Sequence, residues 1–343
     1  MYSINLPILI SYGINNNNMS VIKGYTIQGI LAKGGMATIY IAQQESLKRQ
    51  VALKVLNPKL DTVILDHFLD ESRIIASLKH PNIIPVYDVG RVGIHFYHAM
   101  EYLEGGDLEA RIAQKQIDVH TALEIILELS DALYLVHSKG IIHGDIKPAN
   151  IVFRSDDCPV LTDFGISKRV DTTGKEQNAE GILTSPTYAS PELIQGQHFD
   201  HRTDIYSLGI VLYEMLVGEK PFKGETKLEM IASSIQDPVP TLPENLMPLQ
   251  PLMDHMLAKD PDERIADGRM ISRYIKKYLR DHPRTTQTAQ NLADDSGFNS
   301  KVVVEYVPES KPGIKETSSK ALIPLLIVLF SIAVAAIIWY FII

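Results

Sequence analysis

Four polar side chains near the middle of the chain have the types and the spacing that phosphoryl transfer to a hydroxyl requires. Asp145 precedes Lys147 by two residues and Asn150 by five, and Asp163 follows thirteen residues after Asn150. One carboxylate can orient an attacking hydroxyl, and an ammonium can offset charge on the moving phosphoryl group, while an amide and a second carboxylate can hold Mg²⁺. A lone His-x-Asp match is weak, but the ordered set that begins at His143 predicts this chemistry.

Elements upstream must position a nucleotide for that reaction. Residues 51–56 form an apolar, β-branched run that predicts a buried strand, and Lys54 lies within it. A second apolar run at 94–101 predicts another strand, and the segment between them favours a helix over 62–78. Glu71 falls on that helix.

These motifs resemble those of eukaryotic-type serine/threonine protein kinases, and bacterial members most. The resemblance runs from Tyr25 to Leu279 and includes residues 189–192, which match the end of an activation segment. It implies an α+β fold with two lobes, a small β-rich N-lobe with one helix and a larger, mainly helical C-lobe. It further implies transfer of the γ-phosphoryl group of ATP to serine or threonine hydroxyls of proteins, with autophosphorylation.

The resemblance assigns catalytic roles to Asp145 and Lys147, and both metal and nucleotide binding to Asn150 and Asp163. The cofactors it implies are ATP and Mg²⁺, with Mn²⁺ as an alternative ion. The expected ATP-binding set is completed by Leu31, Ala32, Lys33, Gly34, Gly35, Ile39, Ala52, Lys54, Glu71, Met100, Glu101 and Leu103.

Within that set, Glu71 is expected to pair with Lys54, because an ammonium on a flexible stem needs a second anchor against the α and β phosphates. Met100 would guard the back of the adenine pocket. Backbone groups of Glu101 and Leu103 would bind the adenine edge.

The sequence departs from the family pattern in two places. Ala32 and Ala37 replace two of the three glycines of the phosphate loop, and Gly144 replaces an arginine that would meet a phosphorylated activation-loop residue. These changes leave open a pseudokinase that binds nucleotide and scaffolds partners, although the complete catalytic set argues against it. Five hydroxyls are candidate phosphorylation sites or ordinary loop residues: Thr172, Thr173, Thr184, Ser185 and Thr187.

A small-molecule phosphotransferase of related fold is the other alternative. The activation-segment end, Asp204 and Arg264 favour protein substrates, since small-molecule relatives typically lack that platform. Glu192 and Arg264 are expected to form a buried ion pair, and Asp204 to hold the catalytic loop backbone. A helix predicted over 119–139 carries His120 and His137, to which we assign no special role.

Composition sets wider limits. The chain has 343 residues, 45% of them hydrophobic, and a net charge of −8, which argues against a nucleic-acid partner. A single cysteine, Cys158, excludes an internal disulfide and suits a reducing compartment.

We divide the chain into an extension at 1–22, with Met19 as an alternative start, a kinase domain at 23–280 and a flexible linker at 281–320. A signal peptide at 1–14 is rejected, because a basic n-region and a cleavage site are missing.

The last segment, 321–343, contains no charged residue. As a helix it would be about 35 Å long, enough to cross a bilayer. Lys311, Lys315 and Lys320 precede it, which favours a cytoplasmic kinase domain. The sequence therefore predicts a single-pass tail anchor without an outer sensor domain, most simply in a bacterial inner membrane.

Overall fold

The computed structural model describes residues 22–58, 60, 69, 72–164 and 186–284. These residues belong to one compact unit, Met1–Thr286. Several predictions of the sequence lie outside the described residues: the extension up to residue 21, Glu71, four of the five candidate hydroxyls, the linker from 285 onward and the predicted membrane segment at 321–343.

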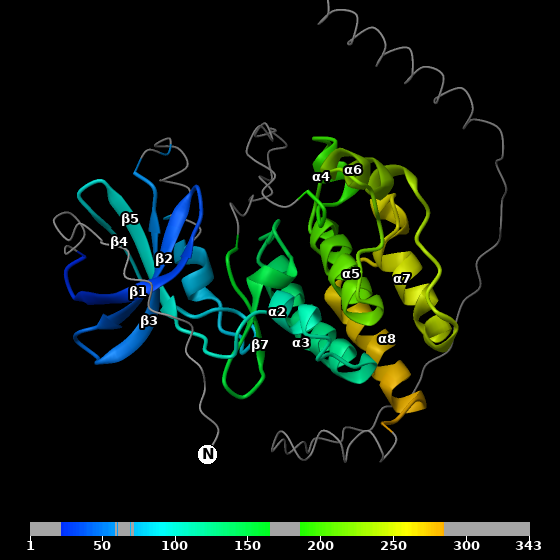
Figure 1. Cartoon of the computed structure of the whole chain (residues 1–343), viewed down its shortest axis with the longest axis horizontal. Coiled ribbons are helices and arrows are strands. Elements are labelled where there is room, and N and C mark those ends of the chain that lie inside the picture. The colour runs from blue at the N-terminus through cyan, green and yellow to red at the C-terminus, as the bar shows by residue number, and fades with distance from the viewer. Residues whose placement is uncertain (1–21, 59, 61–68, 70–71, 165–185, 285–343) are drawn as a thin grey trace, which may run out of the picture. The chain divides into compact units, whose positions relative to one another are not determined.

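The N-lobe is built on one antiparallel sheet, shown in blue and cyan in Figure 1. The strand order is β1-β2-β3-β5-β4. Consecutive residues are buried in the middle of both strands, 51–53 in β3 and 96–100 in β5, so both faces of the sheet are covered there. The strands are β1 Tyr25–Lys33, β2 Ala37–Gln44, β3 Arg49–Leu56, β4 Val86–Val92 and β5 His95–Glu101.

The predicted strands at 51–56 and 94–101 are confirmed by β3 and β5. Residues 72–77 are helical, in agreement with the C-terminal part of the helix predicted over 62–78. The lobe thus has the expected β-rich character.

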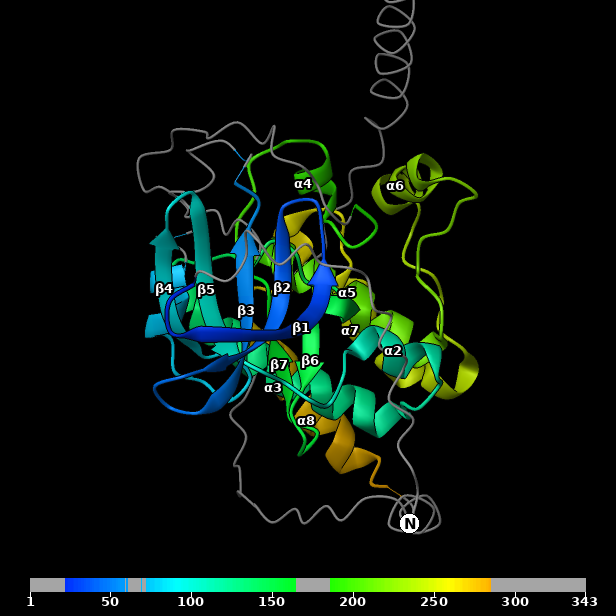
Figure 2. The same cartoon turned by 60° about the vertical axis from the view of Figure 1, so that its left-hand side comes forward.

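The C-lobe is mainly helical and carries a short hairpin of β6 and β7. Figures 1 and 2 show α3, α5 and α8 side by side within it. Its α-helices and strands are α2 Leu108–Ala113, α3 Val119–Ser138, β6 Ile151–Phe153, β7 Pro159–Leu161, α4 Pro191–Ile194, α5 Arg202–Val217, α6 Lys227–Gln236, α7 Gln250–Met256 and α8 Gly268–Asp281. Short 3₁₀ turns are η1 Pro148–Asn150, η2 Glu244–Leu249 and η3 Pro261–Glu263. The two-lobed α+β arrangement is confirmed.

Local signals account for the ends of the central helix. The side chain of Asp118 caps α3 by accepting a hydrogen bond from the Thr121 backbone N–H. After α3, Gly140 adopts a left-handed φ of 69°, which glycine reaches without strain and which ends the helix. The observed bounds of α3 agree with the predicted helix at 119–139 to within one residue.

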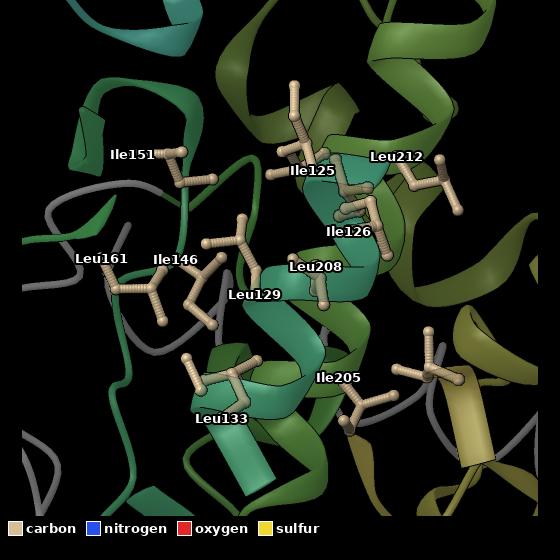
Figure 3. Close-up of a cluster of buried hydrophobic side chains, with 14 of the residues drawn as sticks. Ile125, Ile126, Leu129, Leu133, Ile146, Ile151, Leu161, Ile205, Leu208 and Leu212 are labelled. Carbon is tan, nitrogen blue, oxygen red and sulfur yellow. The ribbon is translucent and has the colours of Figure 1, made fainter. Parts of the chain in front are cut away.

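The core of the C-lobe lies between α3, α5 and the β6–β7 hairpin. Figure 3 shows Leu129 and Leu133 of α3 beside Leu208 and Ile205 of α5, with Ile146 of the catalytic loop pointing toward them. Ile146 is 1% exposed. The loop that carries Asp145 and Lys147 is therefore anchored in the hydrophobic core by its own apolar side chain.

Among the described residues, the structure has no helix that is both long enough and apolar enough to span a bilayer.

Candidate active site

The catalytic loop brings three of the predicted residues into direct contact. The Lys147 ammonium donates to Asp145 Oδ2 at 2.7 Å. Asn150 Nδ2 donates to the same oxygen at 3.0 Å and to the Asp145 backbone carbonyl at 2.8 Å. Asn150 can reach back in this way because the 3₁₀ turn η1 folds the chain immediately after Lys147. The five-residue spacing seen in the sequence therefore becomes a single hydrogen-bonded unit.

Asp163 faces the N-lobe. Its Oδ1 accepts a hydrogen bond from the ammonium of Lys54 on β3 at 2.8 Å, and both side chains are largely buried. Burial raises the pKa of the Asp163 carboxyl, but the positive charge and hydrogen bond of Lys54 outweigh it and hold that pKa below its usual value. Asp163 also has a φ of 48°, a strained conformation for a residue with a β-carbon. Such strain often marks a functional residue.

His143 packs beneath the catalytic loop in its neutral form. Its Nε2 donates to the Thr162 carbonyl at 3.1 Å, and its Nδ1 accepts from the Asp145 backbone N–H at 3.3 Å. Burial lowers the pKa of the imidazole, which is consistent with one nitrogen donating and the other accepting. The His143 ring lies 4.5 Å from the Phe164 ring, centroid to centroid. His143 thereby joins the residues before Asp145 to those around Asp163.

Asp204 holds the catalytic loop backbone, as the sequence predicts. Its two carboxylate oxygens accept hydrogen bonds from the backbone N–H groups of His143 and Gly144, both at 2.8 Å. Asp204 lies near the start of α5 and is completely buried. Gly144, which replaces an arginine of the family pattern, has a φ of 74° that glycine adopts freely.

His137 is a site residue that the sequence analysis missed. Its Nε2 donates to Asp204 Oδ2 at 2.7 Å, so it completes the set of donors around that carboxylate. The expectation that His137 has no special role is wrong on this point. His137 and Asp204 lie 67 residues apart, and the helical pattern of α3 carries no signal for the contact.

The predicted phosphate-binding residues occupy one hairpin. Leu31, Ala32 and Lys33 end β1, and Gly34 and Gly35 lie in the turn to β2. The turn is closed by a backbone hydrogen bond from Gly34 to the Ala37 carbonyl at 2.9 Å. Ala32 and Ala37, which replace two glycines of the family pattern, therefore do not prevent the hairpin from forming.

The apolar residues predicted around adenine come together beneath this hairpin. Ala52 of β3 lies opposite Met100 of β5, and Ile39 of β2 lies opposite Lys54. Ala52 and Met100 are buried, and Ile39 and Leu103 pack against the same cluster. This arrangement could enclose a flat, mostly apolar ring.

Glu101 requires a refinement of its predicted role. Its backbone N–H donates to the Pro85 carbonyl at 3.0 Å, so its carbonyl is the backbone group that can bind an adenine edge. Its carboxylate is held by Arg154, through bonds of 2.9 and 2.7 Å. Glu101 thus links the end of β5 to the β6–β7 hairpin.

His98 is a second residue that the sequence analysis missed. It lies opposite Lys54 in the register of β3 and β5 and is buried. Its Nδ1 is 3.0 Å from the hydroxyl of Ser72, the residue that follows the predicted Lys54 partner at position 71. Burial and the positive charge of Lys54 lower the pKa of His98 to about 3, so the imidazole is neutral. The neighbours of His98 are set by the sheet register, which the sequence of β5 does not reveal.

The end of the activation segment is fixed by the predicted ion pair. Arg264 donates to the Glu192 carboxylate through two bonds of 2.8 and 3.0 Å, and both side chains are buried. The same arginine donates to the carbonyls of Ala258 and Arg202. Just upstream, Thr187 accepts a hydrogen bond from Lys220 at 3.3 Å. This predicted contact between Glu192 and Arg264 is confirmed.

Asn150 and Asp163 are suited to hold a hard divalent cation. The Asn150 amide nitrogen is used by Asp145, which leaves Oδ1 as the oxygen available for a metal. The low pKa of Asp163 keeps its carboxyl ionised. Mg²⁺ usually takes one or two carboxylate or amide oxygens from the protein and completes its shell with phosphate and water. The donor set therefore fits Mg²⁺ bound together with a nucleotide.

Comparison with protein families matches residues 25–278 of the chain to the protein kinase domain. Comparison with curated proteins finds bacterial relatives. The chain is 36% identical over 261 residues to serine/threonine-protein kinase PknJ of Mycobacterium tuberculosis, covering 73% of this chain and 44% of the relative.

It is 35% identical over 297 residues to serine/threonine-protein kinase PknB of Mycolicibacterium smegmatis, covering 80% of this chain and 47% of the relative. It is 32% identical over 294 residues to serine/threonine-protein kinase PknA of M. tuberculosis, covering 81% and 68%. The chain thus spans less than half the length of the PknJ and PknB relatives.

Proposed function

The chain belongs to the protein kinase family, and from that premise we propose that it is a serine/threonine protein kinase. It transfers the γ-phosphoryl group of ATP to serine or threonine hydroxyls of proteins. The observation that carries the proposal is the convergence of Lys147 and Asn150 on one oxygen of Asp145, at 2.7 and 3.0 Å. A pseudokinase has no need for that arrangement.

Each residue then has a distinct role. Asp145 accepts the proton of the attacking hydroxyl, and Lys147 offsets the charge that accumulates on the transferred group. Both observed donors use Asp145 Oδ2, so Oδ1 is the oxygen left to orient the hydroxyl. Lys54 lies 2.8 Å from Asp163, which supports a role for its ammonium in binding phosphate oxygens next to the metal. Mg²⁺, held by Asn150 and Asp163, would neutralise negative charge on the phosphates.

Serine/threonine specificity is supported by Lys147, two residues after the catalytic acid, and by the serine/threonine-protein kinases to which the chain is similar. Protein substrates are supported by the intact end of the activation segment, where Arg264 fixes Glu192. Autophosphorylation is part of the proposal, and Thr187 is the candidate acceptor within the described residues.

The proposal also includes attachment to a membrane through residues 321–343, with the kinase domain on the cytoplasmic side. It rests on the uncharged composition of that segment and on the lysines that precede it. The bacterial origin of the relatives supports an inner membrane.

The test measures transfer of labelled γ-phosphate from ATP by the full chain in lipid nanodiscs with Mg²⁺. Its substrates are the chain itself and a generic basic protein. Asp145→Asn and Lys54→Met should each lower transfer by at least a hundred-fold, since the first removes the acceptor of the hydroxyl proton and the second removes the cation that positions the α and β phosphates. Asp156→Asn and Lys139→Met, which change exposed residues of the same types, should retain it.

Phosphoserine or phosphothreonine that depends on Asp145 and Lys54 would establish the proposed activity. Nucleotide binding without transfer to any protein would instead favour a pseudokinase scaffold. Transfer to small hydroxyl compounds alone would favour a small-molecule phosphotransferase. If the chain is recovered separately from the lipid nanodiscs, the proposed membrane attachment is refuted, whatever the result of the activity measurement.

A further inference from the structure

Helix α8 and the three residues after it are rich in positive charge, whereas the chain as a whole is negatively charged. Residues 268–284 contain one acid, Asp281, whereas the whole chain has a net charge of −8. Their basic residues are Arg269, Arg273, Lys276, Lys277, Arg280 and Arg284.

These basic side chains lie on one face. At about 100° per residue, helical geometry places the five that belong to α8 within an arc of roughly 100°, and Arg284 follows three residues after the helix ends at Asp281. All six are exposed residues, and the side chains of Arg269 and Arg280 are 61% and 66% exposed. We call this set the basic face of α8.

The opposite side of α8 is fixed to the core. Ile271 and Ile275 are completely buried, and Ser272 donates a hydrogen bond to Asp131 of α3 at 2.8 Å. A β-carbon at Gly268 would lie 2.1 Å from the Ser130 carbonyl oxygen, so the two helices meet at backbone distance there. The basic face is therefore displayed on a rigid support, as Figure 2 illustrates for α3 and α8.

Part of this charge is balanced locally. Arg269 pairs with Asp267 at 3.2 Å and lies over the Tyr134 ring, and Arg284 approaches Asp118 and Glu124, both at 3.4 Å. The centre of the face has no such balance. No acidic side chain in the described part of the chain pairs with Arg273, Lys276 or Lys277.

We propose that the basic face of α8 binds the headgroups of anionic lipids, in the same membrane that residues 321–343 are proposed to cross. The inference rests on the proposed membrane attachment. Residues 282–320 separate α8 from that segment, so contact of the helix with the lipid surface would be an intramolecular event, for which weak attraction suffices.

A membrane is favoured over an acidic protein because of what the face contains. Its exposed centre is charged, and the side chains that could anchor a protein interface, Ile271 and Ile275, point into the core. Basic residues near an anionic bilayer each strengthen binding roughly five-fold, without requiring a shaped pocket. Salt weakens such an attraction, which falls off within about 10 Å at 0.1 M ionic strength.

The test uses the full chain in nanodiscs of phosphatidylcholine, with or without phosphatidylglycerol. A fluorophore is placed at Met270→Cys in a Cys158→Ser background, since Met270 is 48% exposed and borders the basic face. Quenching by a nitroxide on the lipid headgroup reports contact. A second reporter at Leu47→Cys, 63% exposed in the N-lobe, serves as reference.

The decisive variant neutralises the centre of the face, with Arg273→Gln, Lys276→Gln and Lys277→Gln. Its matched control removes the same charge from three exposed lysines elsewhere, with Lys23→Gln, Lys48→Gln and Lys139→Gln. Contact in the anionic discs should be lost in the first variant, where the equilibrium for contact falls roughly a hundred-fold. Contact with the anionic discs should persist in the control variant, and 0.5 M salt should abolish this contact.

Equal quenching at Met270→Cys with and without phosphatidylglycerol would overturn the inference. So would unchanged quenching in the neutralised variant, or a response of the reporter to soluble polyglutamate and not to lipid, which would indicate an acidic protein partner. If the chain is active and stays with the discs but α8 shows no contact with the lipid headgroups, this inference is refuted and the proposed function still stands. A chain that does not stay with the discs defeats the membrane attachment and, with it, this inference.

Discussion

At the scale of single residues, Asp204 holds the backbone of the catalytic loop, although it takes no part in the proposed chemistry. It accepts three hydrogen bonds, from the backbone N–H groups of His143 and Gly144 and from His137 Nε2. Burial raises the pKa of Asp204, but these donors outweigh it and keep the pKa below its usual value. The loop that presents Asp145 is thus oriented by a buried charge whose partners are all donors.

Replacing Asp204 by asparagine tests this role. Asparagine offers one acceptor oxygen and directs an N–H₂ group at a donor, so the loop backbone must shift to relieve the clash. Since a displacement of about 1 Å can cost a hundred-fold in rate, we expect kcat to fall by about that factor. KM for ATP should change little, because the predicted nucleotide contacts lie mainly on β1, β2, β3 and β5.

Steady-state kinetics of the full chain separates the two parameters. Asp254→Asn, an exposed acid on α7, is the matched control and should behave as the unmodified chain. A variant Asp204→Asn with unchanged kcat would show that the loop holds its position without this carboxylate.

At the scale of elements, Arg264 joins segments that are distant in sequence. Besides its two bonds to Glu192 of α4, it donates to the carbonyls of Ala258 and Lys259 after α7 and of Arg202 at the start of α5. One guanidinium therefore satisfies several buried acceptors, which a planar fork of donors suits well.

Removal of this guanidinium should be costly. Arg264→Met leaves the Glu192 carboxylate buried without its partner, and we expect a loss of about 3–5 kcal/mol in the free energy of unfolding. In the double variant Glu192→Leu with Arg264→Met, the stranded charge is gone, so part of that loss should be recovered. Recovery should be incomplete, because the three carbonyls still lack their donor.

Chemical denaturation of the three variants measures these differences. Arg280→Met, which alters an exposed arginine of α8, should shift the free energy of unfolding by less than about 0.5 kcal/mol. If Arg264→Met proved as mild as Arg280→Met, the pair would have no stabilising role.

Elements that depend on local pattern were predictable, and contacts between elements were much less so. The apolar runs of β3 and β5 and the helical spacing of α3 predict those elements within a few residues. Asp204, Glu192 and Arg264 were predictable only through the family resemblance. His137 and His98 escaped prediction because their importance comes from partners that the fold supplies, Asp204 and Lys54, and no spacing along the chain encodes those contacts.

At the scale of the whole molecule, two ionic contacts between described residues join the lobes. Lys54 of β3 reaches Asp163 of the C-lobe, and Glu101 at the end of β5 binds Arg154 of the β6–β7 hairpin. His98 is buried beside the first of these contacts and remains neutral, with a pKa of about 3. The N-lobe therefore contains a base whose protonation would place a second positive charge next to Lys54.

Stability should consequently fall in mild acid. The pKa of His98 is about 3 when folded and near 6.5 when unperturbed. Between these values the unfolded chain binds a proton that the folded chain does not, so the free energy of unfolding decreases as pH falls, by about 1.4 kcal/mol per pH unit. The variant His98→Gln lacks that contribution. Between pH 6.5 and 5 its free energy of unfolding should therefore fall by about 2 kcal/mol less than that of the unmodified chain.

Denaturation curves recorded at several pH values provide the comparison. His198→Gln, which alters an exposed histidine, should keep the full dependence on pH. Identical slopes for His98→Gln and the unmodified chain would mean that His98 is protonated in the folded protein at mild pH.

The attachment of the catalytic loop to Asp204 also governs how the protein would respond to heat. In many proteins an active-site loop loosens well below the melting temperature, so that activity disappears first. Here the backbone around Asp145 is bound to a completely buried carboxylate on α5, and Ile146 lies in the same core. We therefore expect the loop to loosen only when that core opens, and thermal inactivation to coincide with the melting of the C-lobe itself.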